Sequence, residues 1–248
     1  MDLGLTDRVY VVTGGARGLG RAAADVLVAE GARVVLSGRT EETLAAARGD
    51  AVETVVADNA DPDTPRRLLD AAHARWGRLD GALVSVGGPP KGPVTGITDE
   101  QWTASFEAVF LGAVRLGREI GARLPEGGSL AFVLSSSVRS PLADMAVSNG
   151  LRPGLAMVAK TLADELGPSG VRVNGLLPGR VATERVAELD AASGDPAAAR
   201  AAALRTIPLG RYGEPAEFGR VAAFLLSPAS SFVSGAMVPV DGGMLRAL

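Results

Sequence analysis

The chain has 248 residues, of which 47% are hydrophobic and 21% are charged, and its formal net charge is −3. This composition suits one globular domain over residues 1–248, and the small negative charge excludes a broad positive field that would attract nucleic acid or an anionic membrane. Cysteine is absent and His73 is the only histidine, which excludes disulfides, thiolate metal sites and two-histidine metal sites, so we expect no metal. No apolar run approaches the ~20 residues of a membrane span, and we expect a cytoplasmic protein.

Short apolar segments rich in β-branched residues alternate along the chain with segments of helical period. The predicted strands are 9–12, 33–36, 52–57, 79–86, 130–134, 171–176 and 237–240. The predicted helices are 18–30, 41–48, 63–76, 98–123, 143–167 and 214–226. Because the strands are apolar throughout, helices should cover both of their faces. The pattern therefore predicts an α/β fold of Rossmann type, with a doubly wound parallel sheet of about seven strands.

The first predicted strand runs into a glycine-rich turn with the pattern Thr-Gly-x-x-x-Gly-x-Gly, which begins at Thr13. The first glycine permits backbone angles that other residues rarely adopt. The second has no side chain to separate the backbone from a pyrophosphate, and the third lets the following helix approach the strand. The N-terminus of that helix attracts phosphate. Although a glycine-rich turn without a ligand is the alternative, we expect this one to bind a dinucleotide through Gly14, Arg17, Gly18, Leu19 and Gly20.

The second predicted strand ends at Ser37, Gly38 and Arg39. In related folds an acidic residue near this point holds the ribose 2′-hydroxyl of NAD, whereas an arginine suits the 2′-phosphate of NADP. Arg39, together with Arg17, therefore favours NADP, while NAD remains possible. The alternative is that both arginines are only solvated.

An alanine-rich amphipathic stretch occupies residues 181–211, with a break at 193–196. It follows the carboxyl end of a predicted strand, where ligands of such sheets bind. We interpret it as a lid over a small-molecule substrate. A mobile surface helix is the alternative.

The glycine pattern and the segments after it resemble the short-chain dehydrogenase/reductase family, and most of all its 3-oxoacyl-acyl carrier protein reductases. The segment 57–59 is similar to the family's contact with the adenine edge, the segment 84–87 falls at its Asn-Asn-Ala-Gly motif, and the segment 174–183 is similar to the one that cups the nicotinamide carboxamide. The resemblance implies a homotetramer or homodimer built from the two long helices and the last strand. It also implies further cofactor contacts from Asp58, Asn59, Gly87, Pro178, Gly179, Val181 and Thr183.

The catalytic motif of the family is not present in its usual form. That family uses a tyrosine four residues before a lysine, with a serine about thirteen residues before the tyrosine. The equivalent positions here are Ser148, Arg152 and Ser135, so only the serine remains. The two tyrosines, Tyr10 and Tyr212, lie outside this helix. A serine hydroxyl is a much weaker acid than a phenol, and an arginine is not a proton shuttle.

Three interpretations follow from this combination. The first is an NADP-dependent oxidoreductase with an atypical site, in which Ser135 and Ser148 polarise a carbonyl or imine. The second is a catalytically silent nucleotide-binding or scaffold protein of the same fold, which is favoured by the further departures at Ser85 and Phe110. The third is a lyase or isomerase in which Arg152 binds a substrate carboxylate.

Overall fold

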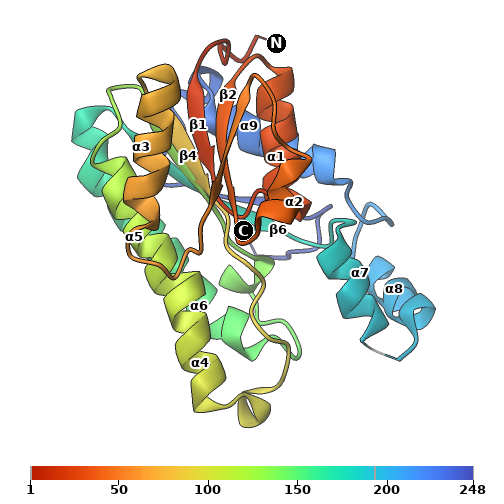
Figure 1. Cartoon of the computed structure of the whole chain (residues 1–248). Helices are drawn as coiled ribbons and strands as arrows, with labels where there is room; N and C mark the ends of the chain where they lie inside the picture. Colours follow the sequence, from red (N-terminus) through yellow and green to blue (C-terminus); the bar gives the residue numbers. More distant parts are fainter. Residues whose placement is uncertain (1, 193, 248) are drawn as a thin grey trace.

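A computed structural model describes residues 2–192 and 194–247. Within these residues one sheet of seven parallel strands forms the centre, in the order β3-β2-β1-β4-β5-β6-β7 (Figure 1). The strands are β1 Val9–Val12, β2 Arg33–Gly38, β3 Val52–Val56, β4 Gly81–Val84, β5 Ser129–Val133, β6 Arg172–Pro178 and β7 Met237–Val240. The strand order reverses between β1 and β4, and such a switch point is where open α/β sheets bind ligands. The predicted fold is confirmed.

Helices cover both faces of the sheet, as the uniformly apolar strands predict (Figure 1). The helices α3, α5 and α6 pack on one face, and α1, α2 and α9 pack on the other. Their bounds are α1 Gly18–Ala29, α2 Glu41–Ala45, α3 Thr64–Trp76, α5 Gly112–Gly121, α6 Ala146–Leu166 and α9 Pro215–Leu226.

Successive residues of the central strand β1 contribute to different cores. Val11 belongs to the core formed with Leu68 and Phe132, whereas Val12 belongs to the core formed with Leu27 and Phe218. All six side chains are fully buried. Because side chains of a strand alternate between faces, a strand buried on both faces must be apolar at every position. Each such side chain contributes about 1.5–3 kcal/mol through its removal from water.

The predicted helix 98–123 is not a regular α-helix along its whole length. It consists of α4 Asp99–Ser105, a π-helical segment Phe106–Leu111, and α5. The wider turn ends where Gly112 approaches the backbone of Asn59 so closely that a Cβ atom would lie 2.2 Å from the Asn59 carbonyl oxygen. Sequence periodicity cannot predict this wide turn, because the contact at its end is with a loop about fifty residues away in the sequence.

The predicted helix 143–167 begins three residues late, at Ala146. The backbone of Asp144 adopts a left-handed conformation with φ of 55°, and its carbonyl accepts a hydrogen bond of 2.7 Å from the Gly92 N–H. Ala146 N–H in turn donates to the Gly92 carbonyl at 3.1 Å. The loop after β4 therefore holds the residues before α6 out of the helix.

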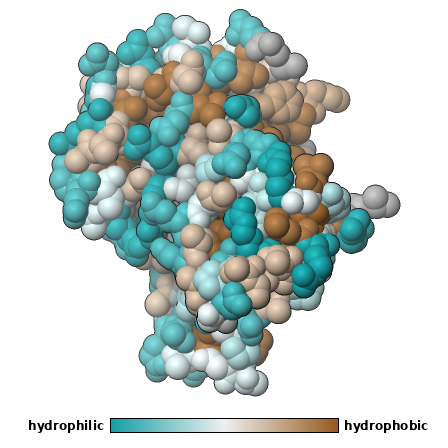
Figure 2. Space-filling view, turned by 90° about the vertical axis from the view of Figure 1, so that its right-hand side faces the viewer, coloured by the Kyte–Doolittle hydropathy of each residue, from teal (hydrophilic) through white to brown (hydrophobic). Residues whose placement is uncertain are grey.

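The predicted lid forms two short helices, α7 Glu184–Ala191 and α8 Pro196–Leu204. They stand apart from the helices that cover the sheet (Figure 1). Viewed from that side of the molecule, hydrophobic residues are interspersed with hydrophilic ones (Figure 2). The predicted break at 193–196 includes Ser193, which lies outside the described residues. In the part of the chain that the structure describes, no helix is both long and apolar enough to cross a bilayer.

Candidate functional site

The glycine turn between β1 and α1 has the shape of a phosphate cradle. A Cβ atom on Gly14, where φ is +56°, would lie 2.7 Å from the Ser85 carbonyl oxygen, and one on Gly20 would lie 2.6 Å from the Gly14 carbonyl oxygen. A Cβ atom on Gly18, in contrast, would meet only the Thr183 methyl group, at 3.9 Å. No side chain caps the N-terminus of α1, so its N–H groups remain available to a ligand.

The two arginines expected at the 2′-phosphate have different surroundings. Arg17 is exposed and pairs with two carboxylates of α7, at 3.2 Å to Glu184 and 3.7 Å to Glu188. Arg39 is also exposed, and it forms no ion pair or hydrogen bond with any residue that the structure describes. Arg17 thus joins the glycine turn to the predicted lid, while Arg39 is unengaged at the end of β2.

The carboxyl ends of β1, β3 and β4 are tied together through Ser85. The Thr13 hydroxyl donates to the Ser85 carbonyl at 2.7 Å and accepts from its N–H at 2.9 Å. The Asn59 amide donates to the same carbonyl at 3.2 Å, and an Asp58 carboxylate oxygen accepts from the Ala60 N–H at 2.9 Å. Asn59 therefore holds the loop with its side chain, and the exposed Asp58 stabilises its own turn.

The segment after β6 reaches back over the glycine turn. Gly179 packs against Asp241 so closely that a Cβ atom would lie 2.7 Å from the Asp241 Cβ, and it follows the half-buried Pro178. Val181 is buried. The Thr183 hydroxyl caps α7 by accepting from the Val186 N–H at 3.4 Å, which leaves its methyl group facing Gly18. The structure thus brings Thr183 of this segment beside the turn, while Leu19 is half-buried against the core and Gly87 is exposed.

The three predicted catalytic residues lie at the carboxyl end of β5 and on the first turns of α6. The half-buried Ser135 caps a short helix, and its hydroxyl oxygen accepts from the Ser137 N–H at 3.1 Å. The Ser137 and Ser148 hydroxyl oxygens are 3.1 Å apart, and Ser137 Oγ also lies 3.4 Å from the Ser148 carbonyl oxygen. One turn further along α6, Arg152 is buried and donates through Nη1 to the Val133 carbonyl.

Neither tyrosine hydroxyl belongs to this cluster. The buried Tyr10 hydroxyl donates to the Leu226 carbonyl at 3.3 Å, and burial raises its pKa. The Tyr212 hydroxyl donates to an Asp190 carboxylate oxygen of α7 at 2.9 Å, and Arg180 pairs with the other oxygen of that carboxylate at 3.0 Å. Burial and then the bond to Asp190 raise the pKa of Tyr212, so this phenol stays protonated and bonded to α7.

Three residues near the site carry no motif that would reveal them in the sequence. Ser137 connects Ser135 to Ser148 through the contacts above. Asn149 closes the loop before α6 with a pair of hydrogen bonds to the backbone of Leu142, at 2.8 and 3.0 Å. Arg185 of α7 donates to the Pro89 carbonyl at 3.0 Å and thereby joins the predicted lid to the loop after β4.

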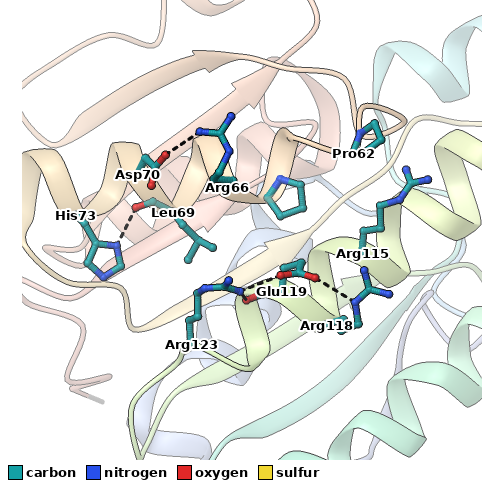
Figure 3. Close-up of a pocket in the computed structure, with 10 residues that line it drawn as sticks. Pro62, Arg66, Leu69, Asp70, His73, Arg115, Arg118, Glu119 and Arg123 are labelled. Carbon is teal, nitrogen blue, oxygen red and sulfur yellow. Dashed lines mark hydrogen bonds and ion pairs between the residues drawn. The ribbon is translucent and has the colours of Figure 1, made fainter.

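A separate surface pocket of about 560 Å³ lies between α3 and α5 (Figure 3). His73 is exposed there, and its Nδ1 lies 2.8 Å from the Leu69 carbonyl oxygen. The surrounding arginines pair with neighbouring carboxylates, for example Arg66 with Asp70 at 3.3 Å (Figure 3). No predicted site residue lines this pocket. Among the described residues, no group of three potential metal ligands comes together.

Comparisons with known proteins agree with this geometry. Residues 14–245 match the family model described as enoyl-(acyl carrier protein) reductase. An uncharacterized oxidoreductase of Mycobacterium tuberculosis is 38% identical over 249 residues, covering 96% of this chain and 91% of the relative. The cis-4-hydroxycyclohexanecarboxylate dehydrogenase of Sinomonas cyclohexanicum is 34% identical, covering 98% of each chain.

Solved structures are similar over the whole chain. The L-sorbose reductase of Gluconobacter frateurii, solved in complex with NADPH and L-sorbose, superposes with a TM-score of 0.92, with 28% identity and 100% of both chains covered. The family match, the sequence relatives and the shared seven-stranded sheet agree with one another. The chain therefore belongs to the short-chain dehydrogenase/reductase family.

Proposed function

We propose that this protein is an NADP-binding oxidoreductase with an atypical active site, which acts on a carbonyl or a related group of a small molecule. The observation that carries the proposal is the cluster of Ser135, Ser137, Ser148 and Arg152 beside an intact glycine turn. Relatives over the full length of the chain are dehydrogenases, and the similar L-sorbose reductase was solved with NADPH. Its cofactor supports NADP here, and Arg39 supports the same choice over NAD.

The glycine turn fits a dinucleotide because the space beside Gly18 is open while Gly14 and Gly20 pack tightly. The N–H groups of α1 would hold the pyrophosphate, and Arg39 would pair with the 2′-phosphate. The nicotinamide would supply or accept the hydride. Pro178 and Gly179 are the residues that we assign to the side of its carboxamide.

Ser135 is the best placed hydrogen-bond donor to a substrate carbonyl. Its oxygen already accepts from Ser137 N–H, so the hydroxyl hydrogen remains for the substrate. Ser148 is more constrained. If Ser137 donates to the Ser148 carbonyl, the Ser148 hydroxyl must donate to Ser137 and is then occupied. With no phenol in the cluster, the proton that completes a reduction comes from water or from the substrate itself.

The test is stopped-flow oxidation of NADPH with a panel of ketones, imines, 3-oxoacyl thioesters and 4-oxocyclohexanecarboxylate, the last suggested by the Sinomonas relative. We expect turnover with at least one member, and a loss of about 10²-fold in Ser135→Ala, as for removal of one oxyanion donor. Ser137→Ala is the matched control, with a smaller loss because it acts only through its neighbours. Absence of turnover above buffer for the whole panel contradicts the proposal.

A catalytically silent nucleotide-binding protein is the second candidate. It is favoured by the hydrogen bonds of Tyr10 and Tyr212, which occupy both phenols elsewhere. Such a protein still gains stability from NADPH, because a ligand that binds only the folded state raises the free energy of unfolding. Thermal protection by NADPH without turnover supports this candidate, whereas turnover excludes it. The lyase or isomerase interpretation requires activity without any change in nicotinamide absorbance.

The lid and the oligomer are also proposals. We interpret α7 and α8 as a lid because Glu184 pairs with Arg17 of the glycine turn and Arg185 donates to the loop after β4, so two contacts join this segment to loops at the carboxyl ends of the strands. A homodimer or homotetramer is supported by the side chains of Phe106 and Met157, which are 42% and 67% exposed on the two long helices. Phe106→Asp is expected to lower the mass measured by sedimentation equilibrium, and an unchanged mass contradicts this interface.

A further inference from the structure

Arg152 is a buried cation whose donors are mostly unused. The residue is 5% exposed, and its Nη1 donates to the Val133 carbonyl. Nε is fully enclosed and has no hydrogen-bond partner. Nη2 also lacks a partner among the described residues, but it is not among the fully enclosed atoms. Four of the five N–H donors of a guanidinium belong to Nη1 and Nη2, and the fifth belongs to Nε, so one edge of the group is free.

The charge of Arg152 is also uncompensated. No carboxylate among the described residues forms an ion pair with it, and burial lowers its pKa to about 10, so it remains a cation at neutral pH. Arg172 is also buried, but its guanidinium is well hydrogen-bonded. Its Nη1 donates to the Leu225 carbonyl and the Ser230 hydroxyl, both at 2.8 Å, and its Nη2 donates to the Ser227 carbonyl at 2.9 Å. Buried charges are normally paired or fully hydrogen-bonded. Arg152 is neither.

We infer that Arg152 is the anchor for a carboxylate of the substrate, which pairs with the free edge formed by Nε and Nη2. This inference names the substrate class for the site of the proposed function and rests on it for the identity of the reacting group. Two parallel N–H donors match the two oxygens of a carboxylate. One cation also balances one carboxylate, whereas a phosphate would bring nearly twice the charge. Only one hydrogen bond, to Val133, holds the guanidinium, and binding of the carboxylate requires a shift of the side chain that exposes Nε.

The position of Arg152 fits this role. It lies one helical turn after Ser148 on α6, so both side chains project from the same face of the helix. Ser148 is linked through Ser137 to Ser135, the proposed donor to the carbonyl. A substrate whose carboxylate meets Arg152 therefore places its other end among the serines. A ribose hydroxyl is the competing occupant, and it would use the free donors but would leave the positive charge unbalanced.

The test is isothermal titration calorimetry of the NADP⁺-loaded protein with acetoacetate, levulinate and 4-oxocyclohexanecarboxylate, each compared with its neutral methyl ester. NADP⁺ is used because it permits no reduction of the ligand, so binding is read without turnover. We expect at least one acid to bind at least tenfold more tightly than its ester. Equal binding of acid and ester throughout the panel overturns the inference.

Variants test whether Arg152 causes the tighter binding of the acid than of its ester. Arg152→Gln keeps hydrogen-bonding capacity without the charge and is expected to abolish the preference for the acid, while Arg152→Lys retains part of it. Arg66→Gln is the matched control, because Arg66 lies in the surface pocket between α3 and α5, which no predicted site residue lines, and its loss is expected to leave the preference intact. A preference that survives in Arg152→Gln overturns the inference. A preference that persists in a protein without reductase turnover supports it, while the proposed function fails on its own.

Discussion

Replacement of Arg152 by methionine is expected to stabilise the apo protein, although it removes a residue from the candidate site. The guanidinium is buried, makes one hydrogen bond to Val133 and has no counter-ion among the described residues. Methionine is shorter than arginine and apolar, so the substitution removes the charge and loses no favourable charge interaction. A gain in stability is the opposite of what most core substitutions produce.

The magnitude follows from the pKa of Arg152, which burial lowers from the ordinary value of arginine to about 10. At about 1.4 kcal/mol per pKa unit this difference corresponds to roughly 3 kcal/mol of destabilisation of the charged form. Loss of the hydrogen bond to Val133 offsets about 1 kcal/mol of the gain. The net gain is therefore about 2 kcal/mol, or a rise in Tm of roughly 4–8 °C for a chain of this size.

The lowered pKa also defines how the destabilisation by Arg152 changes with pH. The folded protein binds the proton less tightly than the unfolded chain, so the destabilisation by Arg152 is fully present below about pH 10 and is relieved as pH rises from there toward the ordinary pKa of arginine. Thermal and urea unfolding of the apo protein at pH 7.5 therefore measures the whole effect.

Arg172→Met is the control. That side chain joins β6 to the end of α9 by donating to backbone carbonyls and a hydroxyl. Its removal leaves these buried acceptors without a donor. We expect a loss of at least about 3 kcal/mol. If Arg152→Met also loses 1 kcal/mol or more, the argument that Arg152 is an uncompensated buried charge is wrong.

Three further substitutions test other parts of the site. Tyr212→Phe removes the hydroxyl that donates to Asp190, so it is expected to cost about 1 kcal/mol in urea unfolding while turnover of NADPH stays within about twofold; a large loss of turnover would identify Tyr212 as the proton donor after all. Arg39→Ser is expected to weaken NADPH by about tenfold in fluorescence titration and to leave NADH unchanged, and equal losses for both would remove Arg39 from the 2′-phosphate site. Hydrogen bonds from Arg211 lower the pKa of Glu217 to about 2. The stability from this pair is therefore present above the ordinary carboxylate pKa and is lost as pH falls toward 2. Glu217→Gln should reduce the fall of Tm at acid pH, and an unchanged fall would contradict the assignment.

The fold could be predicted from the sequence because its signals are local. The strands are apolar at every position, and amphipathic helices alternate with them along the chain. This pattern predicts a parallel sheet that helices cover on both faces. The glycine turn was predictable for a similar reason, since Gly14 and Gly20 are the residues that fit the contacts found there. Counting back along α6 from Lys160 was sufficient to place Ser148 and Arg152 on one helix face.

Contacts between distant segments could not be predicted in this way. The π-helical segment 106–111 precedes a close approach to Asn59, and the late start of α6 depends on Gly92. Arg17 has the charge and the place in the glycine turn that a phosphate ligand needs, but in the structure it pairs with carboxylates of α7. Each of these features depends on a partner that the sequence does not identify.

The sequence by itself determined the sheet, the glycine turn and the absence of a tyrosine from α6, because each is a property of neighbouring residues. The tertiary structure alone decided that both phenols are engaged elsewhere, that Ser137 joins Ser135 to Ser148, and that Arg152 is buried without a counter-ion among the described residues. Burial and pairing of a charge depend on which segments surround it, and only the folded chain brings those segments together.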